Sequence, residues 1–389
     1  MTLEHVGIAI ASPSDAAALQ SLLGIAPYKS EAVASEGVRT AFFGDGGVAG
    51  AAPKMELVEA TSPDSTIATY VEKRGPGLHH LAFEVDALDR HVERARALGI
   101  RVLGEPRPGA DSKRIVFLHP KDTGGVLVEL LESVRPERRW QDVASPAGRI
   151  AVQVTGLADA PPLVVFHAAL GSTELETDRL IAVWERTHRV YGVDLPGHGR
   201  SGDLDTASPD WDDYVSAAIA VVDHFGLSAA HVFGFSMGAG VALALALARP
   251  AAVGRLVVHG ANVQWSAAEV EAMTSPMAPD RIERDTPFWA RRLAEVHGAR
   301  WPGLVAQIVA FTSALPDRWM TDADLAGVAC PTLVSAGDAD RFFDVRHAVG
   351  LWRAIPDARL RVIPGLDHPI QGVDVPTFAA DVERFLLGG

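Results

Sequence analysis

The feature that most constrains the fold is an internal repeat near the N-terminus. His5 lies in a strand-like segment of alternating polarity, and His80 lies in a similar segment 75 positions later. The tripeptide Leu-Gly-Ile recurs at the same offset, at residues 23–25 and 98–100. Each copy of such a repeat is one structural unit that needs a partner to bury its apolar face. The repeat therefore predicts two copies of one small fold that pair with each other.

Each copy has the pattern of one strand, one helix and further strands. The helical stretch of each copy stops at a glycine placed as a C-cap, Gly24 and Gly99. In chain order the predicted elements are strand 3–10, helix 14–23, strands 40–43 and 55–58, then strand 78–85, helix 88–98 and strands 101–103, 115–118 and 126–130. We therefore predict two βαβββ modules whose sheets pair.

Four polar residues interrupt the apolar strands at matched positions of the two copies. His5 and Glu56 belong to the first copy, and His80 and Glu129 are their counterparts in the second. A pseudo-twofold axis would bring two imidazole nitrogens and two carboxylate oxygens together, a set that suits Co²⁺, Mn²⁺, Zn²⁺, Ni²⁺ or Fe²⁺. Each residue alone is equally consistent with a polar sheet position of no function. The metal site is favoured because an unpartnered buried glutamate is costly and all four residues recur.

Four segments of this region resemble the methylmalonyl-CoA epimerases of the vicinal-oxygen-chelate, or glyoxalase, superfamily. They are EHVGIA at 4–9, KMEL at 54–57, GLHH at 77–80 and, most specifically, FLHPKDTGGVLVEL at 117–130. The resemblance covers residues 1–132 and implies an α+β vicinal-oxygen-chelate domain. It also implies metal ligands at His5, His80 and Glu129, with Glu56 at the fourth position. His79 is expected to point to the other face of its strand and to be structural.

The resemblance further implies metal-assisted enolisation and epimerisation of a methylmalonyl-CoA-like acyl thioester. A metal chelated by the thioester carbonyl and the malonyl carboxylate acts as a Lewis acid and stabilises the enolate. Epimerisation needs a base on each face of that enolate, and Glu129 is expected to serve one face. Some members of the family carry a glutamate for the other face, where this chain has Thr40. Because threonine is a poor base, another group replaces that glutamate or the reaction is not a simple epimerisation.

A second domain is expected after a linker. Residues 133–147 are polar, contain two prolines and lack periodicity, which predicts an interdomain linker. From residue 148 to 389 apolar strands alternate with helices, which predicts a mostly parallel sheet covered on both faces.

A nucleophile motif stands in this second domain. Residues 234–238 read G-F-S-M-G, between an apolar strand and an apolar helix, so that Ser236 would stand at a tight strand-to-helix turn. Acidic residues at the end of the strand-like segment 331–337 and His368 at the end of the next strand follow in the order Ser, Asp, His. These features resemble the α/β-hydrolase family over residues 148–389. The resemblance implies a triad of Ser236, His368 and Asp340. Asp338 is the competing acid, and Asp340 is favoured because the family's acid usually stands three places after the glycine.

The resemblance also places an oxyanion hole. The loop that reads H-G-x-x-G in the family reads H-A-A-L-G at residues 167–171 here, and the backbone N–H groups of Ala169 and Met237 would form the hole. Ala168 replaces a glycine, which requires a negative φ there. Asp367, His198 and His231 are expected to be structural or solvated.

A segment rich in tryptophan, from about residue 262 to 321, predicts a helical cap over this active site. Most of its large apolar side chains are expected to pack the cap onto the sheet, and one or two to line an apolar pocket. Such a pocket favours an acyl or alicyclic substrate. The large side chains are Trp265, Met273, Met277, Phe288, Trp289, Trp301, Phe311 and Trp319.

Composition excludes several other classes of function. The formal net charge of −14 argues against a nucleic-acid partner, which would need a basic face. No apolar run approaches the roughly 18 residues of a membrane helix, and residues 1–11 lack the pattern of a signal peptide, so a cytoplasmic location is expected. The single cysteine, Cys330, excludes an internal disulfide and a cysteine metal cluster.

Three hypotheses follow for the whole chain. The first is a bifunctional, metal-dependent enzyme that enolises or epimerises an acyl-CoA thioester and hydrolyses an ester, thioester or lactone. The second leaves only the hydrolase active, with the N-terminal domain as a binding or dimerisation module, and Thr40 favours it. The third makes the hydrolase half inert, which Ala168 favours and the complete triad opposes. The epimerase resemblance also implies a homodimer.

Overall fold

A computed structural model describes most of the chain. The described residues are 2–23, 26–27, 29–34, 36–44, 53–111, 113–133, 136–315 and 319–388. The chain divides into two compact units, Met1–Arg135 and Pro136–Gly389. No helix in the described ranges is both long and apolar enough to cross a membrane.

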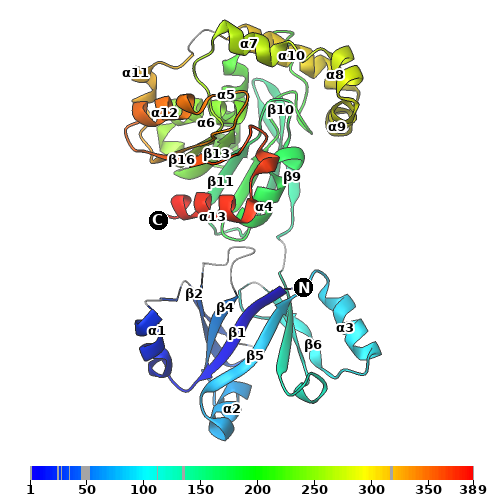
Figure 1. Cartoon of the computed structure of the whole chain (residues 1–389), viewed down its shortest axis with the longest axis vertical. Coiled ribbons are helices and arrows are strands. Elements are labelled where there is room, and N and C mark those ends of the chain that lie inside the picture. Colours follow the sequence, from blue (N-terminus) through cyan, green and yellow to red (C-terminus); the bar gives the residue numbers. More distant parts are fainter. Residues whose placement is uncertain are drawn as a thin grey trace. The chain divides into compact units, whose positions relative to one another are not determined.

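The first unit is built around one sheet of eight strands, shown in blue to cyan-green in Figure 1. Its elements are β1 Thr2–Ile10, η1 Pro13–Ala16, α1 Ala17–Leu23, β2 Lys29–Val33, β3 Val38–Phe43, β4 Lys54–Ala60, α2 Thr66–Arg74, β5 Gly77–Glu84, α3 Leu88–Ala97, β6 Val102–Pro108, β7 Lys113–Leu118, η2 Pro120–Asp122 and β8 Leu127–Ser133. The sheet order is β2-β3-β4-β1-β5-β8-β7-β6.

This order shows the twofold relation that the repeat predicts. The first strands of the two copies, β1 and β5, pair antiparallel at the centre of the sheet. The last strand of each copy lies parallel to the first strand of the same copy, β4 beside β1 and β8 beside β5. The prediction of two paired βαβββ modules is therefore confirmed. Gly99 has the positive φ of a helix stop (75°), whereas Gly24 lies outside the described residues.

The second unit contains another sheet of eight strands with helices on both faces. Its elements are β9 Arg139–Ser145, β10 Gly148–Thr155, β11 Pro162–Phe166, η3 Thr173–Thr177, α4 Asp178–Trp184, β12 Arg189–Val193, α5 Trp211–His224, β13 Ala230–Phe235, α6 Met237–Ala248, η4 Pro250–Ala252, β14 Val253–His259, α7 Ala267–Thr274, α8 Pro279–Asp285, α9 Pro287–His297, η5 Gly298–Arg300, α10 Trp301–Ser313, α11 Asp322–Leu325, β15 Thr332–Gly337, α12 Val345–Ala354, β16 Ala358–Ile363, η6 Ile370–Gly372 and α13 Val375–Leu386.

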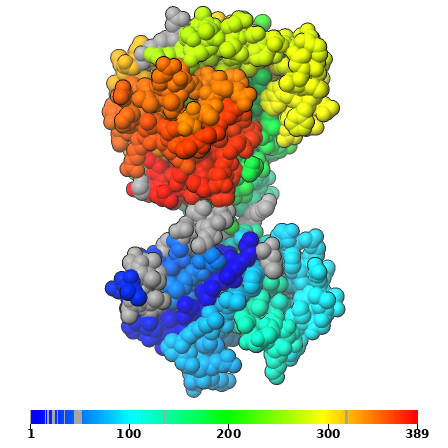
Figure 2. Space-filling view, viewed as in Figure 1, coloured from blue at the N-terminus to red at the C-terminus, as the bar shows by residue number. Residues whose placement is uncertain are grey.

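The sheet of the second unit is mostly parallel. Its order is β16-β15-β14-β13-β11-β12-β10-β9, and the last two strands run antiparallel to their neighbours. In the space-filling view, orange and red segments that include α12 and α13 cover the left and lower part of this unit's visible face (Figure 2). Helices α7 to α10 are inserted between β14 and β15, in the segment for which a cap was predicted.

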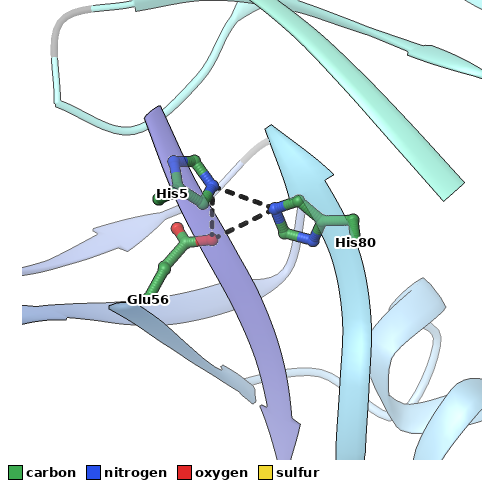
Figure 3. A group of neighbouring side chains, drawn as sticks. All are labelled: His5, Glu56 and His80. Atoms are coloured by element: carbon green, nitrogen blue, oxygen red, sulfur yellow. Dashed lines mark hydrogen bonds and ion pairs between the residues drawn. The ribbon is translucent and has the colours of Figure 1, made fainter. Parts of the chain in front are cut away.

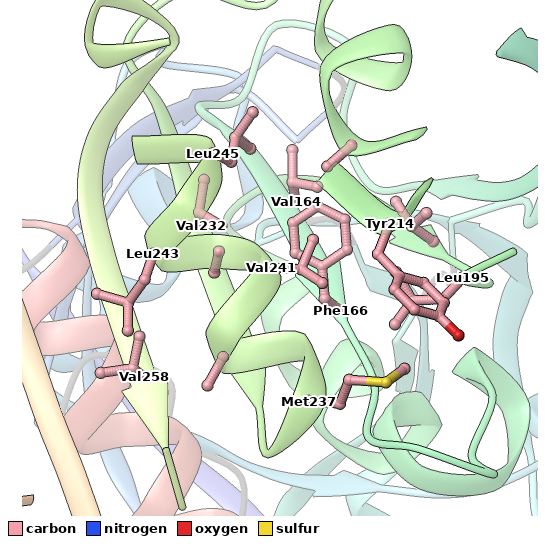
Figure 4. Packing of buried hydrophobic residues seen from close by; sticks show 14 of the residues in the cluster. Val164, Phe166, Leu195, Tyr214, Val232, Met237, Val241, Leu243, Leu245 and Val258 are labelled. Carbon is pink, nitrogen blue, oxygen red and sulfur yellow. The ribbon is translucent and has the colours of Figure 1, made fainter. Parts of the chain in front are cut away.

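The larger core of the second unit lies between the sheet and helix α6. Strand β11 is almost wholly apolar, as expected of a strand covered on both faces. Helix α6 is apolar on every side, which is typical of a helix buried between a sheet and other helices. Figure 4 shows Val164, Val232 and Leu243 from β11, β13 and α6 in this packing. Helix α6, which follows the candidate nucleophile Ser236, is thus held in place by packing around it.

The predicted linker is wrong in part. Residues 139–145 form β9, which pairs along its length with β10 at the edge of the second sheet. Only Val143 of this strand is fully buried, because an edge strand exposes most of its side chains. A strand with so few apolar positions has no alternating pattern, and its polar sequence was therefore mistaken for a linker.

Candidate metal centre and candidate hydrolase triad

Two imidazoles and two carboxylates meet in the first unit. The Nε2 atoms of His5 and His80 are 3.0 Å apart. Oε2 of Glu56 is 3.2 and 3.4 Å from these two nitrogens, and Oε2 of Glu129 is 3.3 and 3.1 Å from them. Figure 3 shows the first three side chains converging from β1, β4 and β5. All four predicted ligand residues are at least nine-tenths buried.

The positions of these residues follow from strand register. His5 and Glu56 lie on neighbouring parallel strands, as do His80 and Glu129. The antiparallel pairing of β1 with β5 then places the two pairs beside each other. Because side chains alternate between the faces of a strand, all four point to one face of the sheet.

The donor set fits a divalent cation. Atoms about 2.0–2.2 Å from one cation stand about 3.0–3.4 Å from one another, which matches the separations among His5, Glu56 and His80. Ligand atoms of His5, Glu56 and His80 lie within 4.8 Å of one another. Oε2 of Glu129 also contacts both imidazoles.

Each ligand imidazole is also contacted by the residue that precedes it. Nδ1 of His5 contacts the Glu4 carboxylate, and Nδ1 of His80 lies 3.0 Å from Nδ1 of His79. Such partners fix the ring orientation and leave Nε2 for a metal. The expectation that His79 lies on the far face is wrong, because it lines the same cavity as His80. A signal was present in the sequence, since both partners stand at the same position of the repeat.

Charge is concentrated in this cluster. Burial lowers the pKa of His5, but hydrogen bonds to Glu129, Glu4 and Glu56 outweigh it and raise that pKa to about 12. Burial likewise opposes the charge on Glu129, and hydrogen bonds to His5 and His80 hold the pKa of its carboxyl below its usual range. A cation bound at the Nε2 atoms would displace any proton held there.

The cluster borders a cavity of ≈ 220 Å³. Its wall is mostly apolar, with Val38, Val58 and Phe117 among the lining residues. Thr40 also lines it, and the buried hydroxyl of this residue has no hydrogen-bond partner among the described residues. The cavity thus offers space for a small acyl group beside four potential ligands.

In the second unit, three side chains predicted as a triad are in contact. Oγ of Ser236 is 3.0 Å from Nε2 of His368, and Nδ1 of His368 is 2.7 Å from Oδ2 of Asp340. The other oxygen of Asp340 accepts hydrogen bonds from the backbone N–H groups of Phe342 and Phe343 at 2.8 and 2.9 Å. The competing acid, Asp338, instead accepts from the N–H of Gly365 at 2.6 Å.

Ser236 stands on a strained turn between β13 and α6. Its φ is 53°, in the left-handed region that side chains other than glycine rarely adopt. A Cβ atom at Gly234 would lie 2.3 Å from the carbonyl oxygen of Gly238, and one at Gly238 would lie 2.4 Å from that of His167. Only glycine fits at both positions, which explains the G-x-S-x-G pattern.

The predicted oxyanion loop lies beside the serine. The backbone N–H groups of Ala169 and Met237 donate to no described residue, so both are available to a ligand. Ala168 avoids positive φ, as the sequence analysis required, but Leu170 adopts φ 60°. No residue pattern indicated this strain, because leucine seldom adopts that conformation.

The remaining candidates have partners other than the side chains of the triad. Asp367 pairs with Arg341, and Nδ1 of His231 lies 3.2 Å from Nε2 of His188. The buried His198 accepts the N–H of Leu170 at 3.1 Å.

Comparison with known proteins supports the fold assigned to each of the two units. A family model described as the Glyoxalase/Bleomycin resistance protein/Dioxygenase superfamily matches residues 4–117, and one described as the alpha/beta hydrolase fold matches residues 161–375. Mitochondrial methylmalonyl-CoA epimerase from Homo sapiens is 38% identical over 131 residues, which are 33% of this chain and 72% of that protein.

Relatives of the second half are more distant. A 2-hydroxymuconate semialdehyde hydrolase from Pseudomonas putida is 28% identical over 225 residues, which are 52% of this chain and 78% of that protein. The crystal structure of an esterase from Rhodococcus sp. ECU1013 has a TM-score of 0.54 at 21% identity and covers 64% of this chain and 98% of its own. That structure agrees with the fold described above.

Both sets of matches cover separate parts of one chain. The protein is therefore a two-domain enzyme that belongs to the alpha/beta hydrolase family through its second unit and to the methylmalonyl-CoA epimerases of the glyoxalase superfamily through its first.

Proposed function

We propose that the chain is bifunctional. Its first unit enolises or epimerises a methylmalonyl-CoA-like acyl thioester with the help of a divalent metal. Its second unit hydrolyses an ester, thioester or lactone by a Ser-His-Asp mechanism. The observation that carries the first activity is the meeting of four potential ligand atoms beside an acyl-sized cavity. The contact between Ser236 and His368 carries the second.

In the first unit, His5, Glu56, His80 and Glu129 would hold the metal. When bound there, a divalent cation supplies Lewis acidity that stabilises negative charge on the substrate's carbonyl oxygens. The apolar wall of the cavity holds the acyl group and excludes water. Glu129 takes the proton from the carbon between the two carbonyl groups and returns a proton to the same face, which exchanges the α-proton; epimerisation requires in addition a proton donor on the opposite face.

Thr40 stands where a base for the other face of the substrate would be expected. Its hydroxyl is buried in the cavity wall without a partner, so it is able to donate a hydrogen bond to a substrate oxygen. It is too weak a base to remove a carbon-bound proton. We therefore propose that Thr40 orients the substrate and that Glu129 performs the proton exchange.

In the second unit, the Ser236 hydroxyl attacks the carbonyl carbon of the substrate while His368 Nε2 accepts its proton. Asp340 holds His368 in the tautomer that keeps Nε2 free to accept. The N–H groups of Ala169 and Met237 stabilise the negative charge that develops on the carbonyl oxygen. His368 then returns the proton to the leaving group, and water releases the acyl group by the same steps in reverse.

Two variants of the full chain separate the activities. We expect metal-loaded wild type to incorporate solvent deuterium into methylmalonyl-CoA and to hydrolyse p-nitrophenyl butyrate. Ser236→Ala should abolish ester hydrolysis and labelling by a fluorophosphonate while leaving deuterium exchange unchanged. Glu129→Gln should abolish exchange and leave ester hydrolysis unchanged. Metal bound by wild type but not by His80→Ala, together with an absence of exchange, would point to another reaction of the superfamily.

One observation favours a narrower function. Thr40 stands where some epimerases carry the second base, which agrees with an N-terminal unit that binds an acyl ligand or mediates dimerisation without chemistry. On that alternative, methylmalonyl-CoA binds to the full chain but its α-proton does not exchange in ²H₂O, whatever metal is supplied.

A further inference from the structure

A buried histidine links the helices inserted between β14 and β15 to the oxyanion loop. His297 ends helix α9 and is 3% exposed. Its Nε2 atom lies 3.0 Å from the carbonyl oxygen of Leu170, in the oxyanion loop. Its Nδ1 atom lies 3.0 Å from the backbone nitrogen of Gly199, in the turn that follows β12. One side chain thus joins three segments that are far apart in the sequence.

The partners of His297 define its protonation. A backbone carbonyl only accepts and a backbone N–H only donates, so Nε2 carries the hydrogen and Nδ1 does not. Burial lowers the pKa of His297 to about 4, which agrees with a neutral ring. The adjacent ring of His198 has the opposite tautomer, because its Nε2 accepts from Leu170 and its Nδ1 contacts the carbonyl of Pro196 at 2.9 Å. Leu170 is therefore held at both its N–H and its carbonyl.

The rest of the loop is held in a similar way. The N–H of Ala168 donates to the buried carboxyl of Glu176 at 2.8 Å, and the carbonyl of Ala168 accepts from Nδ1 of His167 at 2.7 Å. The N–H of Ala169 lies between these fixed groups and has no described partner. The loop is thus fixed on both sides of Ala169, whose N–H is the one that this loop supplies to the proposed mechanism.

Leu170 needs this restraint. Its φ of 60° is unfavourable for a leucine, so the loop would relax if its hydrogen bonds were lost. A change of φ at Leu170 would rotate the peptide groups beside it. An oxyanion donor acts only when it points at the developing charge, and small displacements are costly.

We propose that His297 is a positioning residue, through which the α7–α10 segment holds the oxyanion loop in its working conformation. This proposal rests on the proposed hydrolase function of the second unit. A purely structural role is the competing explanation, in which the ring only fills space between α9 and the sheet. The two explanations differ in whether the hydrogen bond to Leu170 matters by itself.

Three variants of the full chain separate them. Glutamine carries an N–H donor at about the distance of Nε2, so His297→Gln keeps the bond to Leu170. Asparagine is shorter and reaches only the position of Nδ1, so His297→Asn keeps the bond to Gly199 alone. His297→Ala removes both bonds. Arg291→Ala, at an exposed position of the same helix, is the matched control.

The readout is the hydrolysis of p-nitrophenyl butyrate. We expect His297→Ala and His297→Asn to lower kcat and kcat/KM equally, by roughly 10–100-fold, because an oxyanion donor acts in the transition state. His297→Gln should recover most of that loss, and Arg291→Ala should equal wild type. Fluorescence-monitored unfolding checks the second unit separately, since all eight tryptophans lie after residue 135. If His297→Ala unfolds, the comparison of His297→Gln with His297→Asn still distinguishes a positioning role from a purely structural one.

Two results would overturn the proposal. Equal losses in all three variants, or losses confined to KM, would show that His297 only fills space. Wild type that is not labelled by a fluorophosphonate at Ser236 would overturn the hydrolase function itself. The second result is distinguishable from the first because it does not involve His297.

Discussion

Gly7 lies directly beneath the imidazole of His80. The two residues face each other across the β1–β5 pair, and a Cβ atom at Gly7 would lie 2.1 Å from Cε1 of the ring. No side chain can occupy that space while His80 stays in place. The glycine two positions after His5 is therefore part of the candidate metal centre, although it contributes no ligand.

Substitution of Gly7 should thus remove the metal without removing a ligand. We expect Gly7→Ala to displace His80 and to weaken metal binding by more than about tenfold, the smallest effect expected from disturbing a ligand's surroundings. Gly77→Ala is the matched control on β5, because a Cβ atom there meets nothing within 4 Å. Titration of the metal-free proteins with Co²⁺ or Zn²⁺ measures the difference. Equal affinities in the two variants would contradict the assignment of His80 as a ligand.

The partners of the ligand imidazoles give a second prediction. Glu4 contacts Nδ1 of His5 and forms an ion pair with Lys54 at 2.6 Å. Burial would raise the pKa of Glu4, but the hydrogen bond to His5 and the nearby ammonium groups hold it well below its usual value, so the carboxylate stays charged. We expect Glu4→Ala to lower metal affinity by roughly 10–100-fold with all ligands intact.

The corresponding partner of His80 is a neutral ring. Burial lowers the pKa of His79 to about 4. A neutral acceptor binds an N–H less strongly than a carboxylate does, so His79→Ala should cost less affinity than Glu4→Ala. Calorimetric titration of both variants tests this order. The reverse order would indicate that Lys54, rather than His5, is the important partner of Glu4.

The sequence was sufficient to predict which side chains meet at each candidate site but not what holds them. His5 and Glu56 were predictable because the repeat and strand alternation together define a face of the sheet. Ser236 was predictable because its turn requires glycines at fixed positions. The contact of His297 with Leu170 spans 127 residues and depends on how a helix packs, which no local pattern records.

Two elements with few apolar residues were also not predicted from the sequence. Strand β2 has no fully buried residue, and its sequence, KSEAV, is mostly polar, so no apolar alternation marks it. Helix α2 buries only Ile67, and its N-cap, Ser65, is its main sequence signal. Both elements are held by tertiary contacts more than by their own sequence pattern.

The triad gives a prediction that discriminates two acids in one loop. Asp340 contacts Nδ1 of His368, whereas Asp338 accepts a hydrogen bond from the backbone N–H of Gly365. We therefore expect Asp340→Asn to lower kcat for p-nitrophenyl butyrate by about 10⁴-fold, because an amide favours the wrong histidine tautomer. Asp338→Asn should retain most of the activity. The opposite ranking would assign the acid to Asp338.

The buried histidines around the oxyanion loop predict loss of stability in acid. Burial lowers the pKa of His167 and of His297 to about 4, and lowers that of His198 well below its usual value. The unfolded chain binds these protons near pH 6.5, so between pH 6.5 and 4 it holds more protons than the folded protein. Stability is therefore fully present above pH 6.5 and decreases as the pH falls toward 4.

The size of this effect is measurable in one variant. A histidine with a folded pKa of about 4 lowers the free energy of unfolding by about 2 kcal/mol between pH 7 and pH 5. His297→Gln keeps the contact with Leu170 but does not titrate, so the decrease in this range should be smaller by about that amount. Urea unfolding followed by tryptophan fluorescence reports the second unit alone. An unchanged pH dependence in His297→Gln would show that this ring is already protonated in the folded protein, which contradicts its hydrogen bond from Gly199.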